Sequence, residues 1–190
     1  MHVPSSSRIA PFALAGLLAL CACQEGSHHP SSSEMAMAAP REGEALALLM
    51  AVDDFEIDAA EDAHDKSNDA AVKNYAAMID ADHTQHRKDT KQVAKDAGLD
   101  AKDTPRVDAL QDQLKKERAN LDDLKGAAYD RAYIDAMVKG HQEVLDLIDK
   151  EFLPVSLTPR VKDHLAATRK HIAQHLDEAK RLRDKLNATS

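Results

Sequence analysis

The sequence predicts an all-α protein, and three observations lead to this class. Only 6 of the 190 residues are Gly and 7 are Pro, whereas a many-turned β fold needs such residues at every turn. Aromatic residues make up 3% of the chain and Trp is absent, so the core has to be built from aliphatic side chains. Finally, the apolar residues recur at helical spacing through most of the chain.

Five helical segments are expected, each bounded by recognisable signals. Gly98 suits the residue that follows a helix, and Thr104 with Pro105 forms a cap and first-turn pair. Thr158 and Pro159 repeat that start signal. The expected segments are 42–67, 68–97, 105–124, 127–153 and 159–186.

The lengths and connections of these segments favour a ferritin-like four-helix bundle. The two short connections, near residue 68 and between 153 and 159, predict antiparallel hairpins. The connection between the second and third long helices contains the whole segment 105–124. It is long enough to travel the length of the bundle, as an extra short crossover helix would. A three-hairpin array with this short helix as an equal partner is the alternative.

The first 22 residues are expected to be a signal peptide. Residues 9–22 form an apolar run that is shorter than the roughly 20 residues a bilayer crossing needs. The run ends in Leu20-Cys21-Ala22-Cys23. This ending resembles the bacterial lipobox, which implies cleavage after Ala22 and lipid attachment at Cys23; an ordinary signal peptide is the alternative. Residues 23–41 are expected to form a flexible tether to a domain at 42–190.

Location and partners follow from the same region and from the charge. By resemblance to known sorting rules, Gln24 after the lipidated Cys implies the outer membrane, with the domain facing the periplasm and the lipid anchor attaching it to the membrane. The formal net charge is −8, which disfavours nucleic acid as a partner because nucleic acid needs a basic surface. Nothing in the sequence identifies a protein partner.

Each long segment has an apolar stripe that becomes polar near its middle. The alternating spacing of four and three residues marks the face turned to the core. Near the four midpoints this face holds Glu56, His83, His141 and His175. At 1.5 Å per residue, their offsets put them within roughly two turns of a common level. We therefore expect one carboxylate and three imidazoles to converge inside the bundle.

This donor set predicts a metal site. Carboxylate and imidazole ligands on facing helices are how helical bundles hold metal, and the set suits one ion of Zn, Cu, Fe or Mn. Asp82, Asp130 and Tyr133 are candidates to orient the rings through hydrogen bonds. His86 and His171 widen the choice of ligands, whereas His64 and His164 are expected on the surface.

Three functions remain open. The first is a metal-binding protein with a storage, buffering or stress role. The second is a non-catalytic structural or interaction protein of the cell envelope, in which the polar residues form a buried network. The third is a metal-dependent redox enzyme. No catalytic residue is assigned. The di-iron ferritin pattern, with a Glu-x-x-His on each of two helices, is not met by the histidines of the stripes, whose nearest pattern is Asp80-x-x-His83.

At these residues the chain resembles the bacterial family called domain of unknown function 4142, whose members are exported, ferritin-like helical proteins. The resemblance covers about residues 44–187 and is strongest at Asp82-His83 and in the run from Tyr129 to Tyr133 that leads to His141. It implies the same fold and an exported location, while the family name states no activity. The positions that carry the family pattern are Glu56, Asp82, His83, Asp130, Tyr133, His141 and His175.

Overall fold

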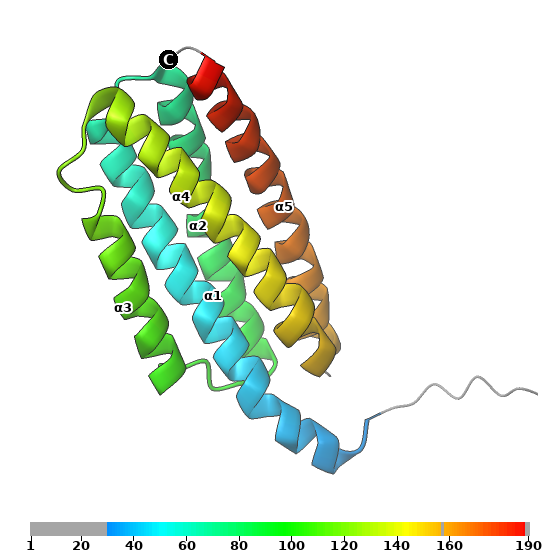
Figure 1. Ribbon diagram of the computed structural model, residues 1–190. Coiled ribbons are helices and arrows are strands. Elements are labelled where there is room, and N and C mark those ends of the chain that lie inside the picture. The colour runs from blue at the N-terminus through cyan, green and yellow to red at the C-terminus, as the bar shows by residue number, and fades with distance from the viewer. Residues whose placement is uncertain (1–29, 157, 189–190) are drawn as a thin grey trace, which may run out of the picture.

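The computed structural model describes residues 30–156 and 158–188, and all regular structure in these ranges is helical (Figure 1). The predicted all-α class is therefore confirmed. A short π-helical turn, Ile148–Phe152, and a 3-10 turn, Leu153–Val155, follow the fourth helix. The helices are α1 (Ser32–Lys66), α2 (Ala70–Asp96), α3 (Pro105–Ala119), α4 (Gly126–Leu147) and α5 (Pro159–Ala188).

The first helix begins at Ser32 rather than at residue 42. The Ser31 hydroxyl accepts a hydrogen bond from the Glu34 backbone N–H, and the Glu34 carboxylate accepts one from the Ser31 backbone N–H. This capping box satisfies two backbone donors at the helix start. The prediction missed it because Pro40, which lies inside the helix, was interpreted as part of a tether. Residues 32–41 are thus helical, and the expected signal peptide and Cys23 lie outside the described residues.

The starts of α2 and α3 lie where they were expected and are capped by side chains. The Asp69 carboxylate accepts from two backbone N–H groups in the first turn of α2, and the Thr104 hydroxyl accepts from the Val107 N–H. After α2, Gly98 has a φ of 65°, a left-handed conformation that a residue without Cβ adopts at little cost. The ends of α3 and α4 lie earlier than expected, at Ala119 and Leu147.

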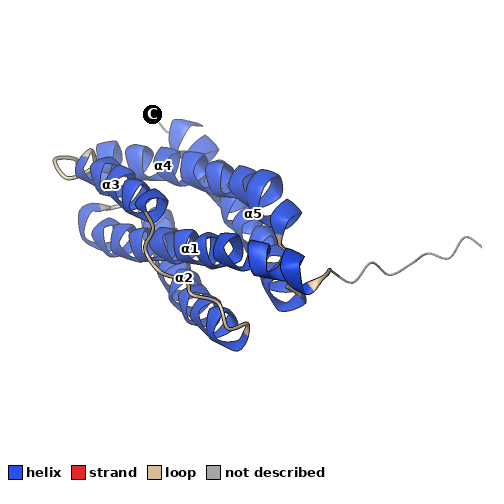
Figure 2. Ribbon diagram, turned by 90° about the horizontal axis from the view of Figure 1, so that it is seen from below, coloured by secondary structure: helices blue, strands red, loops and turns tan. Residues whose placement is uncertain are grey.

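Four long helices, α1, α2, α4 and α5, lie side by side, and α3 packs on the outer side of α1 (Figures 1 and 2). The most extensive contacts join α1 to α2 and α4 to α5, so these pairs form the two antiparallel hairpins. The chain returns through α3, so that α2 and α4 run in the same direction (Figure 1). No helix in the described ranges has both the length and the apolar character that a membrane crossing requires.

The interior has two apolar clusters with a polar layer between them. The first cluster includes Leu46, Val93, Ile148 and Leu165, and the second includes Ala63, Val72, Ile134 and Ala179. Because every long helix contributes to both clusters, the middle of each helix lies at the boundary between them. The four predicted polar positions, Glu56, His83, His141 and His175, fall at this boundary and are buried, and Asp53, which was not predicted, is buried there with them.

Candidate metal centre

Three imidazoles from three helices meet in the polar layer. His83 of α2, His141 of α4 and His175 of α5 are all buried. One potential ligand nitrogen from each lies within 4.8 Å of those of the other two, and the ring centroids are 5.4 to 6.0 Å apart. Among the described residues no other group of His, Cys, Asp or Glu brings three ligand atoms this close. The predicted convergence of the three histidines is therefore found.

One nitrogen of each ring is held by a hydrogen bond that fixes the ring's orientation. The acceptors are two carboxylates and one backbone carbonyl, which cannot donate, so the ring N–H must be the donor. Such outer partners set the tautomer of metal-binding histidines. The donor–acceptor pairs are His83 Nδ1 to Asp53 Oδ1 at 2.8 Å, His175 Nε2 to Asp82 Oδ2 at 3.0 Å and His141 Nδ1 to the Met137 carbonyl at 2.8 Å.

The remaining nitrogen of each ring has no hydrogen-bond partner. These atoms are His83 Nε2, His141 Nε2 and His175 Nδ1, all buried and without a bond to any described residue. In a neutral ring whose other nitrogen is protonated, each of them carries a lone pair. Nitrogens bound tetrahedrally at 2.0–2.1 Å from an ion lie about 3.4 Å apart, so small movements of the rings would bring the three around one ion.

Glu56 of α1 completes the layer. Its side chain is buried, with Oε1 lying 3.9 Å from His141 Nδ1 and Oε2 lacking a hydrogen-bond partner in the described part of the chain. The carboxylate reaches this position beside Gly140, where an added Cβ would stand 4.0 Å from Glu56 Oε1. Burial raises the pKa of Glu56 to about 7. Glu56 is not in the group whose ligand atoms lie within 4.8 Å of one another, so the predicted carboxylate lies beside the three imidazoles rather than among them. Its carboxyl group still holds a proton in part of the population at neutral pH.

The three rings differ in their affinity for a proton. Burial lowers the pKa of His141 to about 3, and burial also lowers the pKa of His175. Burial acts on His83 in the same direction, but its hydrogen bond to Asp53 and the charge of Glu56 outweigh that effect and raise its pKa. Two rings are therefore held neutral, the state that a metal ligand requires, and a metal would compete with a proton at the third.

Asp53 is the important residue that the sequence analysis missed. Its buried Oδ1 accepts from His83 Nδ1 at 2.8 Å and from His86 Nδ1 at 2.9 Å. His86 in turn shares a hydrogen bond with the Thr168 hydroxyl, at 2.7 Å from Nε2. Asp53 stands one helical turn before Glu56 on the same face of the helix, and that spacing is the signal by which it could have been found.

The expectation that His164 is a surface residue is wrong. Its ring is half-buried and stacks on His86, with centroids 5.1 Å apart and planes 9° from parallel. The Thr90 hydroxyl donates to the His86 carbonyl at 2.9 Å, so its oxygen accepts from His164 Nε2–H at 2.8 Å. Burial lowers the pKa of His164 to about 4. The contact between α2 and α5 covers this residue, whereas His64 is exposed as expected.

The three residues expected to orient the rings have different positions. Asp82 does bond to a cluster imidazole, although the ring is that of His175 on α5 and not the adjacent His83. Asp130 and Tyr133 are buried, but no hydrogen bond joins either to a cluster ring among the described contacts. Tyr133 stacks on Tyr129 in the neighbouring apolar cluster, at 5.8 Å between ring centroids.

Comparison with known proteins identifies the family but no individual relative. Neither the curated proteins nor the solved structures include a match to this chain. A family model described as "Domain of unknown function (DUF4142)" matches residues 27–182. The matched range contains Glu56, His83, His141 and His175. Because the match covers most of the sequence, the chain belongs to the DUF4142 family, as its resemblance at the Asp82-His83 and Tyr129–Tyr133 motifs implied.

Proposed function

We propose that the protein binds one transition-metal ion in the core of its helical bundle. His83, His141 and His175 would supply three nitrogens, and Glu56 a carboxylate oxygen. The observation that carries this proposal is the arrangement of the rings: each offers a nitrogen within 4.8 Å of those of the other two, and each has one nitrogen anchored and one unpartnered. Metal-ligating histidines have this arrangement because the outer hydrogen bond fixes the tautomer and increases the basicity of the ligand.

The donor set limits the choice of metal. Three imidazoles and one carboxylate suit Zn, Fe, Mn or Cu, and no sulfur ligand is among the residues that converge. A single ion held by four buried side chains favours storage, buffering or protection against metal stress. Asp53 and Asp82 would strengthen the site by accepting hydrogen bonds from its ligands.

A purely structural polar network is the main competing explanation. Buried networks stabilise a fold when every member is hydrogen-bonded, and a network with unsatisfied members is less stable than an apolar core. Here one nitrogen of each ring, together with Glu56 Oε2, lacks a partner within the described residues, while the opposite nitrogens of the same rings are satisfied. That asymmetry favours a ligand at the centre over a network that exists only to fix helix register.

A metal-dependent redox enzyme is a second candidate, and one cavity favours it. A hollow of about 230 Å³ between α1, α3 and α4 is lined by Glu56 together with mainly apolar side chains such as Phe55 and Leu110. Such a hollow would let a small oxidant approach a bound ion at an open coordination position. The candidate requires turnover of peroxide or superoxide by the metal-loaded chain, with loss of that turnover in Glu56→Ala.

The test is the metal content of the chain purified without an affinity tag and without chelators. Inductively coupled plasma mass spectrometry should find about one equivalent of a single transition metal, and a His83→Ala, His141→Ala double variant should have lost it. His64→Ala is the matched control, because that histidine is exposed. Absence of metal from the wild type, with no uptake when Zn²⁺, Fe²⁺, Mn²⁺ or Cu²⁺ is added, would leave the structural or interaction role as the better explanation.

The location and the finer fold class belong to the same proposal. The parallel course of α2 and α4, with α3 between them in the chain, supports a ferritin-like bundle with a crossover helix (Figure 1). The lipobox-like sequence at 20–23 supports an outer-membrane lipoprotein anchored through Cys23, with its domain in the periplasm. Replacing Cys23 by Ala should abolish incorporation of labelled fatty acid and release the chain from the membrane fraction; unchanged labelling would exclude Cys23 as the acceptor.

A further inference from the structure

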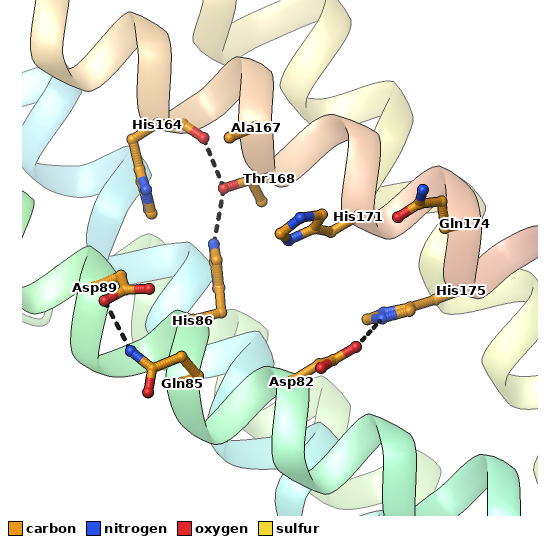
Figure 3. Close-up of a pocket in the computed structure, with 10 residues that line it drawn as sticks. All are labelled: Asp82, Gln85, His86, Asp89, His164, Ala167, Thr168, His171, Gln174 and His175. Carbon is orange, nitrogen blue, oxygen red and sulfur yellow. Dashed lines mark hydrogen bonds and ion pairs between the residues drawn. The ribbon is translucent and has the colours of Figure 1, made fainter.

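A hollow of about 270 Å³ opens between α2 and α5, outside the histidine cluster (Figure 3). Its lining is polar and carries no positive side chain. Two carboxylates, four imidazoles, two amides and one hydroxyl surround it, with Ala167 as the only aliphatic residue. Every one of these polar groups offers oxygen or nitrogen lone pairs, and the absence of Lys and Arg from the lining leaves the two carboxylates to set its charge. This composition suits a divalent cation and its bound waters.

The hollow continues inward to the cluster. A narrower cavity of about 10 Å³ shares Asp82, His86, Thr168, His171 and His175 with the outer one. Its wall also includes His83, whose Nε2 is one of the unpartnered cluster nitrogens. A space of this size accommodates about one water-sized particle. The two cavities together thus extend from the surface to two of the three rings of the centre, those of His175 and His83.

Asp82 lies between the solvent and the histidine centre. Its side chain is 56% exposed, whereas that of His175, to which it is bonded at 3.0 Å, is 7% exposed. Figure 3 shows this pair at one end of the hollow, with His171 one helical turn away on α5 and Asp89 on the facing helix α2. A cation held near Asp82 would therefore be one side chain away from a ligand of the centre.

The other cavity that reaches the centre is less suited to an ion. The hollow beside Glu56 is lined mainly by apolar groups, including Val52, Phe55 and Leu114. Two of its carboxylates, Glu117 and Glu143, are paired with the Lys139 ammonium at 2.9 and 3.6 Å. A cation that enters would therefore meet a fixed positive charge between mainly apolar walls, where losing hydration is costly. The two cavities therefore differ in chemistry, although both reach residues of the same centre.

We infer that the hollow between α2 and α5 is the port through which a divalent transition-metal ion reaches the histidine centre. The ion docks there with part of its water shell, attracted by Asp82 and Asp89 and held by His171, and then passes the Asp82–His175 pair to the inner nitrogens. This inference rests on the proposed metal site and adds its route of loading.

The rate of loading tests the inference, with Co²⁺ as the probe because its visible absorption reports its coordination. Stopped-flow mixing of the metal-free chain with Co²⁺ at low salt would be compared for Ala167→Arg and Ala166→Arg. Both alanines are exposed neighbours on α5, but only Ala167 lines the hollow. A fixed positive charge in the port should slow loading by about tenfold or more, and added salt should reduce the difference. Ala166→Arg should load at nearly the wild-type rate.

A second pair of variants makes the test independent of steric effects. His171→Ala with Asp89→Asn removes two groups of the port and leaves the centre intact. His64→Ala with Asp65→Asn is the matched control on the exposed end of α1. The port variant should slow both Co²⁺ loading and its extraction by a chelator by a similar factor, because a route changes rates and not the equilibrium affinity.

The outcomes separate the port from the centre. Full Co²⁺ binding at equilibrium, with loading rates equal in Ala167→Arg and Ala166→Arg, overturns the port and leaves the metal site standing. Failure of every chain, wild type included, to bind Co²⁺ at equilibrium overturns both. Slower loading confined to the two port variants, with unchanged equilibrium affinity, is the result expected.

Discussion

The polar layer and the two apolar clusters beside it are built by the same helices, yet they satisfy their side chains in opposite ways. In the clusters, residues such as Leu46 and Ile79 are wholly buried among aliphatic neighbours. In the layer, His83 and His141 are just as buried, but each has one nitrogen bonded and one without a partner in the described structure. The clusters bury mainly apolar groups, with the hydroxyls of Tyr129 and Tyr133 as unpartnered exceptions, whereas in the layer every ring leaves one nitrogen without a partner among the described residues.

This difference indicates what each region is for. A buried cluster of aliphatic groups stabilises the fold directly, at about 25 cal/mol per Å² of apolar surface removed from water. Buried polar atoms without partners cost free energy instead. The layer therefore lowers the stability of the metal-free chain, and a bound ion would recover that loss. Variants in the two regions should separate stability from metal binding.

The largest effect is expected for His141→Leu, a change from a buried polar ring to an apolar side chain. The wild type should gain about 4 kcal/mol of unfolding free energy when Zn²⁺ is present at a thousand times its Kd, and the variant should gain none. Without metal, the unfolding free energy of the variant should equal or exceed that of the wild type, with an error of about 1 kcal/mol, because an unpaired polar atom has been removed. Denaturant unfolding with and without Zn²⁺ measures both quantities.

His64→Leu is the control for this variant, because its histidine is exposed near the end of α1. It should keep the full response to Zn²⁺. A His141→Leu chain that is still stabilised by Zn²⁺ to the wild-type extent would place the metal elsewhere in the protein.

The second largest effect is expected in the apolar cluster, for Ile79→Ala. Ile79 is wholly buried one turn before His83 in α2. Truncating it should destabilise the metal-free chain by about 3 kcal/mol, through lost burial and the cavity left behind. The Kd for Zn²⁺, measured by competition with a chromogenic chelator below the unfolding transition, should change less than about threefold. A much larger rise in the Kd for Zn²⁺ would show that the apolar cluster also determines metal binding.

The sequence was informative where one helix determines its own structure. The caps at Asp69 and Thr104 and the apolar stripes are local patterns, and the structure confirms them. The stripes also placed His83, His141 and His175 on inward faces, because a helical face is set by spacing alone. The capping box at Ser31 is an equally local pattern, but Pro40 led us to expect a flexible tether there instead of a helix.

The contacts between helices were not predictable in the same way. Asp82 was expected to orient one of the rings, but only the structure shows that this ring is that of His175 on another helix. Asp53 links α1 to two histidines of α2, and His164 is covered by the approach of α2 to α5. Each of these depends on the rotation and register of two helices, which the spacing within one helix does not determine.

A smaller effect is expected for Asp53→Asn, which tests the outer support of the centre. Oδ1 of the carboxylate accepts from His83 and His86, and Oδ2 lies 2.9 Å from the same His86 nitrogen. An amide lacks the negative charge and places an N–H donor at one of these oxygens, against a ring N–H. The Kd for Zn²⁺ should rise by roughly 10- to 100-fold, the usual cost of altering a hydrogen-bond partner of a metal ligand. Competition titration with a chelator of known affinity measures the change.

Asp54→Asn is the matched control, because it removes the same charge from the next residue, which is exposed. Its Kd should stay close to that of the wild type. Equal losses in the two variants would mean that net charge, and not the bond to His83, sets the affinity.

The smallest effect is the pH dependence that Glu56 gives to metal binding. Burial raises the pKa of Glu56 from 4.5 to about 7, and a carboxyl group must lose its proton to bind a metal. Below about pH 7 the affinity for Zn²⁺ should therefore rise with pH, by at most about tenfold per unit from this group. The raised pKa of His83 acts in the same direction, so Glu56→Gln should make the slope shallower without abolishing it.

The metal-free chain should show the opposite trend. Because the folded pKa of Glu56 lies above its unfolded value, protonated Glu56 contributes stability that is complete below about pH 4.5 and lost as the pH rises to about 7. The unfolding free energy of the wild type minus that of Glu56→Gln should thus fall across this window, and chelator-treated samples at several pH values measure it. A flat difference would mean that Glu56 is not held in the polar layer as a desolvated carboxyl group, and the contrast between layer and clusters would then rest on the imidazoles alone.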